Sequence, residues 1–237
     1  MDSGKLYVIG TPIGNLRDIT LRAIETLDKI EVLVCEDSRV AAKLINALMT
    51  SGRLTKKPRY IAYNEFNEDR VWSELVALVA GGAQVGLVSD AGMPTISDPG
   101  YKLIRGILDS QLPLEVIPGP TALTTALPYS GLGGEVVIYL GFLPKTRGKA
   151  QKMLEASRGM LEGIGSGRLV LYVSPHRLSK DLALISVVLG EVKCVLLREL
   201  TKQFEERVEL SVSEMIARYE GKKVKGELVL ILSQSSK

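Results

Sequence analysis

Short apolar runs alternate with amphipathic stretches through the first half of the chain. The runs predict strands at residues 6–9, 31–35, 59–62, 85–89 and 114–117. The stretches between them place apolar residues at helical spacing and predict helices at residues 21–27, 40–48, 71–79 and 101–108. Apolar strands that alternate with helices are typical of a mostly parallel sheet covered on both faces.

The pattern changes after the segment Ser130-Gly131-Leu132-Gly133-Gly134, which disfavours regular structure. Beyond it, one helix is predicted at residues 150–161 and strands at residues 136–140, 169–173, 194–197, 207–210 and 228–232. Because these strands follow one another with fewer helices between them, we expect a mixed sheet. The sequence therefore predicts two α/β domains, residues 1–132 and residues 133–237.

Composition and charge narrow the class of protein. Of the 237 residues, 46% are hydrophobic, 24% charged and 5% aromatic, which excludes disordered, collagen-like and disulfide-scaffold proteins. The formal net charge of +3 is too small to indicate a nucleic-acid partner. The charge is unevenly distributed, however: residues 1–132 carry 13 basic and 15 acidic side chains, and residues 133–237 carry 17 and 12. The second half is therefore the better candidate to meet an anion.

Cys35 and Cys194 lie in apolar runs without a CxxC spacing, which predicts buried free thiols in a reducing compartment. We expect no metal site. The first ten residues lack the apolar core of a signal peptide, and no apolar run approaches the roughly 18 residues that a membrane span needs. These observations predict a cytoplasmic protein without a membrane partner.

The first predicted strand leads into Gly10-Thr11-Pro12-Ile13-Gly14, followed by Asn15. The glycines permit close approach of the backbone to a ligand. Pro12 stands where a dinucleotide-binding GxGxxG segment has its second glycine, which argues against that fingerprint.

Polar loops also follow the second, fourth and fifth strands. The second ends in Glu36-Asp37-Ser38-Arg39, where Asp37 or Ser38 could equally well cap the next helix. The fourth leads into a run of small residues from Ser89 to Gly100, in which Asp90 can accept hydrogen bonds from a ribose or an ammonium group. Because the carboxyl ends of parallel strands share one edge of a sheet, these loops predict a composite pocket for a small polar cofactor.

Eight segments occur in a characteristic order: LYVIGTPIGNLRDIT, CEDSR, VSDAGMPTISDPG, VIPGPTA, GFLPK, SPHRL, RELTK and KGELVLIL. Together they resemble the tetrapyrrole-methylase-like family, and within it the branch that methylates small-subunit ribosomal RNA. The resemblance implies S-adenosylmethionine as methyl donor, two α/β domains with the cofactor in the cleft between them, and a homodimer. It also implies methyl transfer to the ribose 2'-hydroxyl of a cytidine in small-subunit (16S) ribosomal RNA or in the assembled small subunit.

The resemblance carries a set of cofactor contacts onto this sequence. In the first domain they are Pro12, Ile13, Asp90, Ala91, Gly92, Met93, Ile96, Thr121 and Ala122. In the second they are Tyr172, Val173, Glu199, Leu200, Gly226 and Glu227. The chain departs from the family pattern at Met93, where a threonine is usual, at Ser38, also usually threonine, and at residues 64–68, where two histidines are usual.

A ribose hydroxyl is a poor nucleophile until its proton is being removed, so the reaction invites a general base or a stabilised alkoxide. Glu36 and Asp37 are the first candidates for a base or for substrate positioning, with Asn15 and Arg39 orienting them. Lys202 could stabilise developing negative charge. His176 could also act as a base, although a structural role is the favoured interpretation of a lone histidine.

Two basic segments are candidate RNA contacts, and either could instead be a solvated face. They are Lys145, Arg147, Lys149 and Lys152, and then Lys222, Lys223 and Lys225. Few aromatic residues are present for base stacking, which favours a structured RNA over a loose single strand. Two other functions stay open: a related methylase acting on a corrin or porphyrin precursor or on a translation factor, and a cofactor-binding protein without catalysis.

Overall fold

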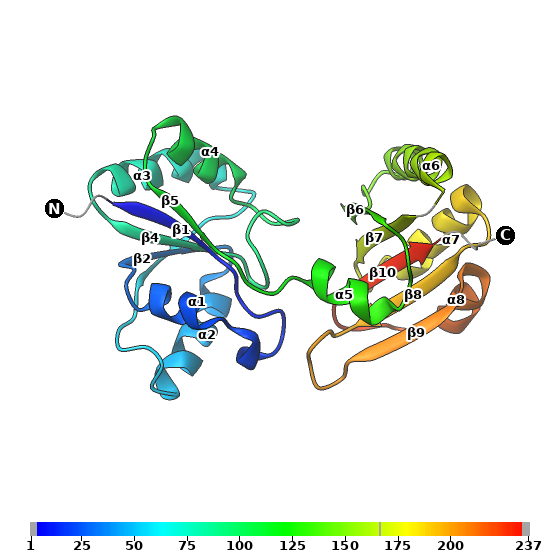
Figure 1. Ribbon diagram of the computed structural model, residues 1–237, viewed down its shortest axis with the longest axis horizontal. Helices are drawn as coiled ribbons and strands as arrows, with labels where there is room; N and C mark the ends of the chain where they lie inside the picture. The colour runs from blue at the N-terminus through cyan, green and yellow to red at the C-terminus, as the bar shows by residue number, and fades with distance from the viewer. Residues whose placement is uncertain (1–3, 166, 234–237) are drawn as a thin grey trace. The chain divides into compact units, whose positions relative to one another are not determined.

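The computed structural model describes residues 4–165 and 167–233, and the chain divides into two compact units, Met1–Thr121 and Ala122–Lys237 (Figure 1). The division falls earlier in the chain than the predicted boundary after Leu132. The reason is helix α5 (Ala122–Ser130), which packs against strands β10 (Leu228–Ser233) and β8 (Lys193–Arg198) of the second unit. Each unit is described by itself.

The first unit is a five-stranded parallel sheet in the order β3-β2-β4-β1-β5. Its strands are β1 (Lys5–Ile9), β2 (Val32–Cys35), β3 (Arg59–Ala62), β4 (Gln84–Val88) and β5 (Leu114–Ile117). Its helices are α1 (Leu21–Leu27), α2 (Ser38–Thr50), α3 (Glu68–Ala80) and α4 (Tyr101–Asp109), with a short 3-10 helix η1 (Leu16–Asp18). The predicted parallel α/β sheet is confirmed.

Helices cover both faces of this sheet. Along β2, Leu33 and Cys35 join the core under α1 and α2, whereas Val32 and Val34 join the core under α3 and α4. This alternation follows from the two-residue repeat of a strand. Figure 1 shows the two helix pairs on opposite sides of the sheet. Because every position of β2 is buried, the strand is apolar throughout.

The connections that follow strands β1 and β4 mark the place where this sheet can bind a ligand. These strands are neighbours, but the chain leaves β1 toward α1 on one face and leaves β4 toward α4 on the other. Connections that diverge in this way open a crevice at the carboxyl ends of the strands, where open α/β sheets bind ligands.

The second unit contains a five-stranded sheet in the order β6-β7-β10-β8-β9. The further strands are β6 (Val136–Phe142), β7 (Gly167–Val173) and β9 (Glu206–Ser211), and the helices are α6 (Arg147–Ile164), α7 (Leu178–Leu189) and α8 (Val212–Tyr219). Strands β6 and β7 are parallel and the other neighbours are antiparallel, so the predicted mixed sheet is confirmed.

Three helices of this unit were not predicted. Helix α5 contains Pro128, which normally interrupts a helix. Helix α7 is apolar through most of its length and ends in the β-branched run around Val187, a composition that also suits a strand. Helix α8 has eight residues, and its start carries a capping box between Ser211 and Glu214 that the sequence already displayed.

Some predictions about the chain as a whole can also be compared with the described residues. Cys35 and Cys194 are buried free thiols, as predicted. Within residues 4–165 and 167–233, no helix has both the length and the apolar character needed to cross a bilayer. No cluster of metal-ligating side chains occurs in the same ranges.

Candidate functional site

The loops that follow β1 and β4 are joined by their backbones. Thr11 and Gly92 form an isolated antiparallel bridge, with N···O distances of 2.8 Å and 3.2 Å. The hydroxyl of the buried Thr11 also donates to the carbonyl oxygen of Gly92, at 3.3 Å. Gly92 has a φ of +83°, a conformation that glycine adopts without strain. The bridge closes the loops of the two central strands onto each other.

A second close approach adds the loop after β5. A Cβ atom on Gly10 would lie 2.6 Å from the backbone of Gly119 and 2.6 Å from the sulfur of Met93. A Cβ atom on Gly119 would lie 2.8 Å from the Cα of Gly10. Only glycine at both positions permits this separation. Three segments that are distant in the sequence are therefore packed together at the carboxyl edge of the sheet.

Most cofactor contacts expected in the first unit fall in this assembly. The Cβ position of Gly92 lies 3.4 Å from the side chain of Ile13 and 3.9 Å from the Cα of Thr121. Ile13 and Thr121 are buried. Pro12, Ala91, Met93 and Ile96 are half-buried in the same loops, and Ala122 is the first residue of α5.

The loop after β4 is also strained. Thr95 and Ser97 have φ values of 70° and 66°, in the left-handed region that side chains other than glycine rarely adopt. Strain of this kind concentrates at ligand sites, where surrounding structure holds the backbone in place. The exposed carboxylate of Asp90 and the loop from Gly92 to Ser97 fit a small polar cofactor that carries positive charge and hydroxyl groups.

Asp90 is held by the neighbouring strand's loop. Its Oδ1 accepts a hydrogen bond from the backbone N–H of Asp37, at 3.1 Å. Burial raises the pKa of Asp90, the hydrogen bond from Asp37 lowers it, and the charge of Asp37 raises it again, with a net upward shift. Among the described residues, no side chain forms an ion pair with Asp90. Its carboxylate is therefore available to a ligand.

Asp37 has a different role. It is the N-cap of α2: its carboxylate accepts from the backbone N–H of Arg39 at 2.8 Å and pairs with the Arg39 guanidinium at 2.6 Å. The side-chain hydrogen bond from Arg39 is the main cause that lowers the pKa of Asp37 to about 2. The capping alternative considered for this residue is thus what the structure shows. Arg39 forms an ion pair with the Asp37 carboxylate, so this carboxylate is already engaged by a cation.

Glu36 differs from Asp37 in its surroundings and in the direction of its pKa shift. It is half-buried at the end of β2. Burial raises its pKa, and the charges of Asp90, Glu65 and Asp37 raise it further. A carboxylate with a raised pKa is a better proton acceptor near neutral pH than an ordinary one. Glu65 comes from the loop after β3, a contributor that the sequence analysis did not name.

Asn15 lies apart from these acids. Its side chain accepts from the backbone N–H of Arg17 at 3.1 Å and caps the short helix η1. In the described part of the chain it makes no hydrogen bond to Glu36, Asp37 or Arg39. The structure thus gathers three of the five predicted catalytic residues at the end of β2 and gives Asn15 a local capping contact.

The fifth, Lys202, lies in a cluster of the second unit. Its ammonium group donates to Oε1 of Glu199 at 2.9 Å and to Oε2 of Glu227 at 3.0 Å. Glu199 has a φ of 54°, and a Cβ atom on Gly226 would lie 2.6 Å from Oε1 of Glu199. Leu200 is buried beside them. Four of the expected second-unit cofactor residues, together with Lys202, therefore form one compact group.

Tyr172 and Val173 end strand β7, which is separated from β8 by β10. The Tyr172 hydroxyl accepts a hydrogen bond from the backbone N–H of Leu123 at 3.1 Å. Its ring packs edge-on against Tyr139 and Phe142, with centroid distances of 5.2 Å and 5.7 Å. These two aromatic neighbours were not among the predicted site residues, although residues 136–140, which include Tyr139, were predicted as a strand.

The remaining candidates lie on the surface of the second unit. His176 is exposed in the turn before α7. Lys149 and Lys152 are exposed on α6. Lys222, Lys223 and Lys225 are exposed between α8 and β10.

Comparison with known proteins identifies relatives over almost the whole chain. The sequence profile of the tetrapyrrole (corrin/porphyrin) methylases matches residues 5–216. The chain is 39% identical over 230 residues to ribosomal RNA small subunit methyltransferase I of Thermotoga maritima, covering 97% of this chain and 98% of that protein. It is 40% identical to the protein of the same name from Mycoplasmopsis pulmonis, covering 96% of each.

Solved structures share the fold at much lower identity. The methyltransferase CobJ superimposes with a TM-score of 0.71 at 16% identity, covering 98% of this chain and 95% of that chain. Uroporphyrin-III C-methyl transferase from Thermus thermophilus, solved with S-adenosyl homocysteine, superimposes with a TM-score of 0.64 at 17% identity, covering 96% and 97%.

Proposed function

Because this chain belongs to the tetrapyrrole (corrin/porphyrin) methylase family, we propose that it methylates the ribose 2'-hydroxyl of a cytidine in small-subunit (16S) ribosomal RNA. The methyl donor is S-adenosylmethionine. The observation that carries the proposal is the near full-length identity of 39% and 40% to proteins named ribosomal RNA small subunit methyltransferase I.

The geometry of the first unit supports binding of this donor. S-adenosylmethionine carries an ammonium group, a sulfonium and ribose hydroxyls, which match the exposed Asp90 carboxylate. Half-buried Pro12, Ala91 and Met93 lie in these loops beside the buried Ile13 and Thr121, so that polar backbone groups and apolar surface occur together. Ligand pockets typically combine these two features.

The donor supplies an electrophilic methyl group, so the protein's task is alignment and removal of one proton. Asp90 and the loops joined by the Thr11–Gly92 bridge hold S-adenosylmethionine in position. Glu36 is proposed as the proton acceptor for the ribose hydroxyl, because its raised pKa makes its carboxylate the more basic one. Asp37, paired with Arg39, positions the Asp90 carboxylate through its backbone N–H.

The group around Glu199 is proposed as a further set of cofactor contacts. Gly226, with a φ of +95°, and the side chain of Glu227 are exposed there. Lys202 holds the two carboxylates of this group, and it is proposed to act through them. We also propose a homodimer, as the family resemblance implies, and a cytoplasmic location, because the buried free thiols of Cys35 and Cys194 are typical of a reducing compartment. Sedimentation equilibrium tests the dimer.

Transfer of label from radioactive S-adenosylmethionine tests the function. The protein is incubated separately with small ribosomal subunits, naked small-subunit RNA and a corrin precursor, and the RNA is then hydrolysed with alkali. A ribose 2'-O-methyl group blocks cleavage, so we expect label in an alkali-resistant dinucleotide that contains cytidine. Label in single nucleotides would indicate base methylation, and label only in the tetrapyrrole would indicate a different substrate; either result overturns the proposal.

A further inference from the structure

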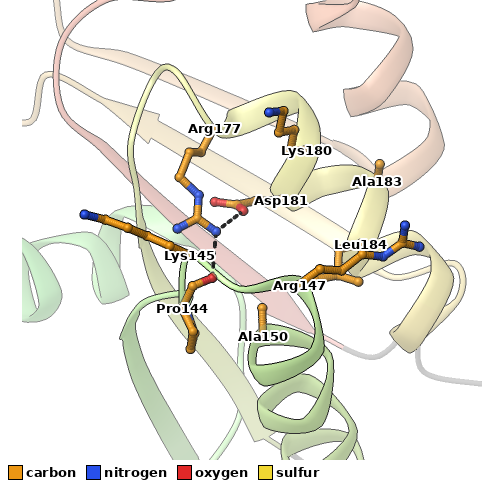
Figure 2. Close-up of a pocket in the computed structure, with 9 residues that line it drawn as sticks. All are labelled: Pro144, Lys145, Arg147, Ala150, Arg177, Lys180, Asp181, Ala183 and Leu184. Atoms are coloured by element: carbon orange, nitrogen blue, oxygen red, sulfur yellow. Dashed lines mark hydrogen bonds and ion pairs between the residues drawn. The ribbon is translucent and has the colours of Figure 1, made fainter.

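The second unit contains a pocket of about 460 Å³ between the beginnings of α6 and α7 (Figure 2). Its walls come from the loop after β6 and from the first two turns of each helix. The lining residues are Pro144, Lys145, Arg147, Ala150, Arg177, Lys180, Asp181, Ala183 and Leu184. The volume lies within the range of about 300–1,000 Å³ typical of ligand sites.

Arg177 is the fixed centre of this pocket. Its guanidinium donates to the carbonyl oxygens of Leu143 at 2.7 Å and Pro144 at 3.0 Å, and to Oδ1 of Asp181 at 2.9 Å. Asp181 is only 5% exposed. Figure 2 shows the guanidinium turned toward Asp181 and Pro144. These bonds tie the start of α7 to the loop after β6, and they pair the Arg177 charge with that of Asp181.

Three further cations on the pocket lack such partners. Lys145, Arg147 and Lys180 are exposed, and none of them forms an ion pair within the described ranges. With Arg177 paired to Asp181, these side chains give the pocket a formal charge of +3. The positive charge of the pocket therefore favours the binding of an anion.

The placement of these cations works against helix stability. Arg147 opens α6, and the first turn of this helix contains no acidic residue. Lys180 lies in the first turn of α7. The positive end of a helix dipole repels a cation and attracts an anion. The N-cap side chain of Thr146 makes no capping hydrogen bond to α6. The first turn of α7 also contains Asp181, which pairs with Arg177. Arg147 and Lys180 therefore remain as positive side chains near two positive helix ends, where an anion would be favoured.

The arrangement favours a chain of phosphates over a single compact anion. Figure 2 shows Lys145, Arg147 and Lys180 on different sides of the pocket, pointing in different directions. The small apolar side chains of Ala150 and Ala183 leave room between them. Cations that surround a pocket in this way match successive phosphates along a nucleic-acid backbone.

We propose that this pocket binds the phosphate backbone of RNA, with Lys145, Arg147 and Lys180 each neutralising a phosphate and Arg177 with Asp181 holding the pocket's shape. The inference rests on the proposed RNA substrate and adds a place where the RNA is held. It joins the start of α6 to Lys180, a residue outside both basic segments of the sequence.

The test compares two triple variants of the full chain that remove the same charge. One is K145Q/R147Q/K180Q. The control is K43Q/R53Q/K57Q in the first unit, whose three cations are likewise exposed and lack an ion pair within the described ranges. Binding of a small-subunit RNA fragment is measured by filter binding between 50 and 300 mM salt, and S-adenosylmethionine binding by calorimetry. Neither variant alters Arg177, Asp181 or a residue of the proposed donor site.

We expect the pocket variant to lose at least about tenfold in RNA affinity and to reduce the slope of log affinity against log salt by about 2–3, since each phosphate contact contributes about one. The control should retain the wild-type slope, and both variants should bind S-adenosylmethionine normally. Equal slopes for the two variants, or no RNA binding by the wild type, overturn the inference. If the RNA is methylated while the slopes are equal, the proposed function stands and only the pocket assignment fails.

Discussion

The backbone N–H of Asp37 donates a hydrogen bond to the Asp90 carboxylate, at 3.1 Å, and so joins the ends of the adjacent strands β2 and β4. The Asp37 side chain is used elsewhere, as the cap of α2 and the partner of Arg39. The group that donates a hydrogen bond to Asp90 is therefore a main-chain N–H positioned by the sheet. Among the described residues, no cation forms an ion pair with the Asp90 carboxylate. This relationship makes Asp90 the residue on which donor binding should depend most.

Asp90→Asn is therefore expected to weaken S-adenosylmethionine binding about 10- to 100-fold, because hydrogen bonds to charged groups contribute about 1.5–3 kcal/mol. The fold should survive, since an asparagine oxygen can still accept from the N–H of Asp37. Calorimetric titration gives the affinity. Asp109→Asn, at an exposed ion pair with Arg105, is the matched control. An unchanged affinity in Asp90→Asn would remove this residue from the site.

The methylation rate should fall at acid pH because Glu36 becomes protonated. Its pKa is raised above 4.5, first by burial and then by Asp90, and only the carboxylate form can accept a proton. The rate should rise as pH increases through this raised pKa. Glu36→Gln should lower kcat by about 10²–10⁴-fold and abolish this limb of the profile. Single-turnover rates between pH 4.5 and 8 provide the measurement.

Stability supplies an independent check on Glu36. A raised folded-state pKa means that folding favours the protonated acid, so the stability that this group contributes is fully present below about 4.5 and is lost as pH rises through the raised value. Glu36→Gln should accordingly be more stable than the wild type at pH 7, and the difference should disappear at acid pH. Urea unfolding at both pH values tests this, and a less stable variant at pH 7 would contradict it.

The Gly10–Gly119 contact should be intolerant of a single methyl group. Gly10→Ala would place its Cβ atom 2.6 Å from the Gly119 backbone, and backbone cannot rotate away as a side chain can. We expect a loss of about 1–3 kcal/mol in unfolding free energy and weaker donor binding. Gly159→Ala is the control: it lies in α6 with nothing within 4 Å of its Cβ position, and it should gain about 0.5–1 kcal/mol. Equal stabilities would contradict the steric argument.

The parallel sheet was predictable because burial on both faces makes an inner strand apolar throughout, as in Val32–Cys35. The carboxyl-edge loops followed from that topology. The helices of the second unit were harder, since their signals conflict: Pro128 argues against α5, and the β-branched residues of α7 suit a strand equally well. In these segments packing against the second sheet overrides local propensity.

The residues that follow each strand could be identified from the sequence, but their hydrogen bonds and ion pairs could not. The sequence indicated that Glu36, Asp37 and Asp90 follow neighbouring strands. It did not indicate that the Asp37 carboxylate would pair with Arg39 while its backbone N–H donates to Asp90. The pocket around Arg177 could not be predicted from the sequence for a related reason. It joins segments more than 30 residues apart, as in the Arg177–Leu143 hydrogen bond with its separation of 34, and such contacts leave no local pattern.

The sequence suggested Lys202 as a stabiliser of developing negative charge. Burial alone would lower the pKa of this ammonium group, but hydrogen bonds to Glu199 and Glu227 produce a net rise. Lys202→Gln would leave the two carboxylates facing each other, next to a backbone with positive φ at Glu199. We expect the affinity for S-adenosylmethionine to fall several-fold and stability to drop by about 1 kcal/mol, with kcat at saturating donor nearly unchanged.

Two further variants make this result interpretable. Lys43→Gln removes an exposed charge on α2, in the first unit, and should behave as the wild type. The double variant Lys202→Gln/Glu199→Gln removes the repulsion between the carboxylates and should recover most of the lost stability, as coupling in a double-mutant cycle requires. If kcat instead falls while donor affinity and stability stay constant, Lys202 acts on the reacting oxygen, because only an interaction made in the transition state lowers kcat alone.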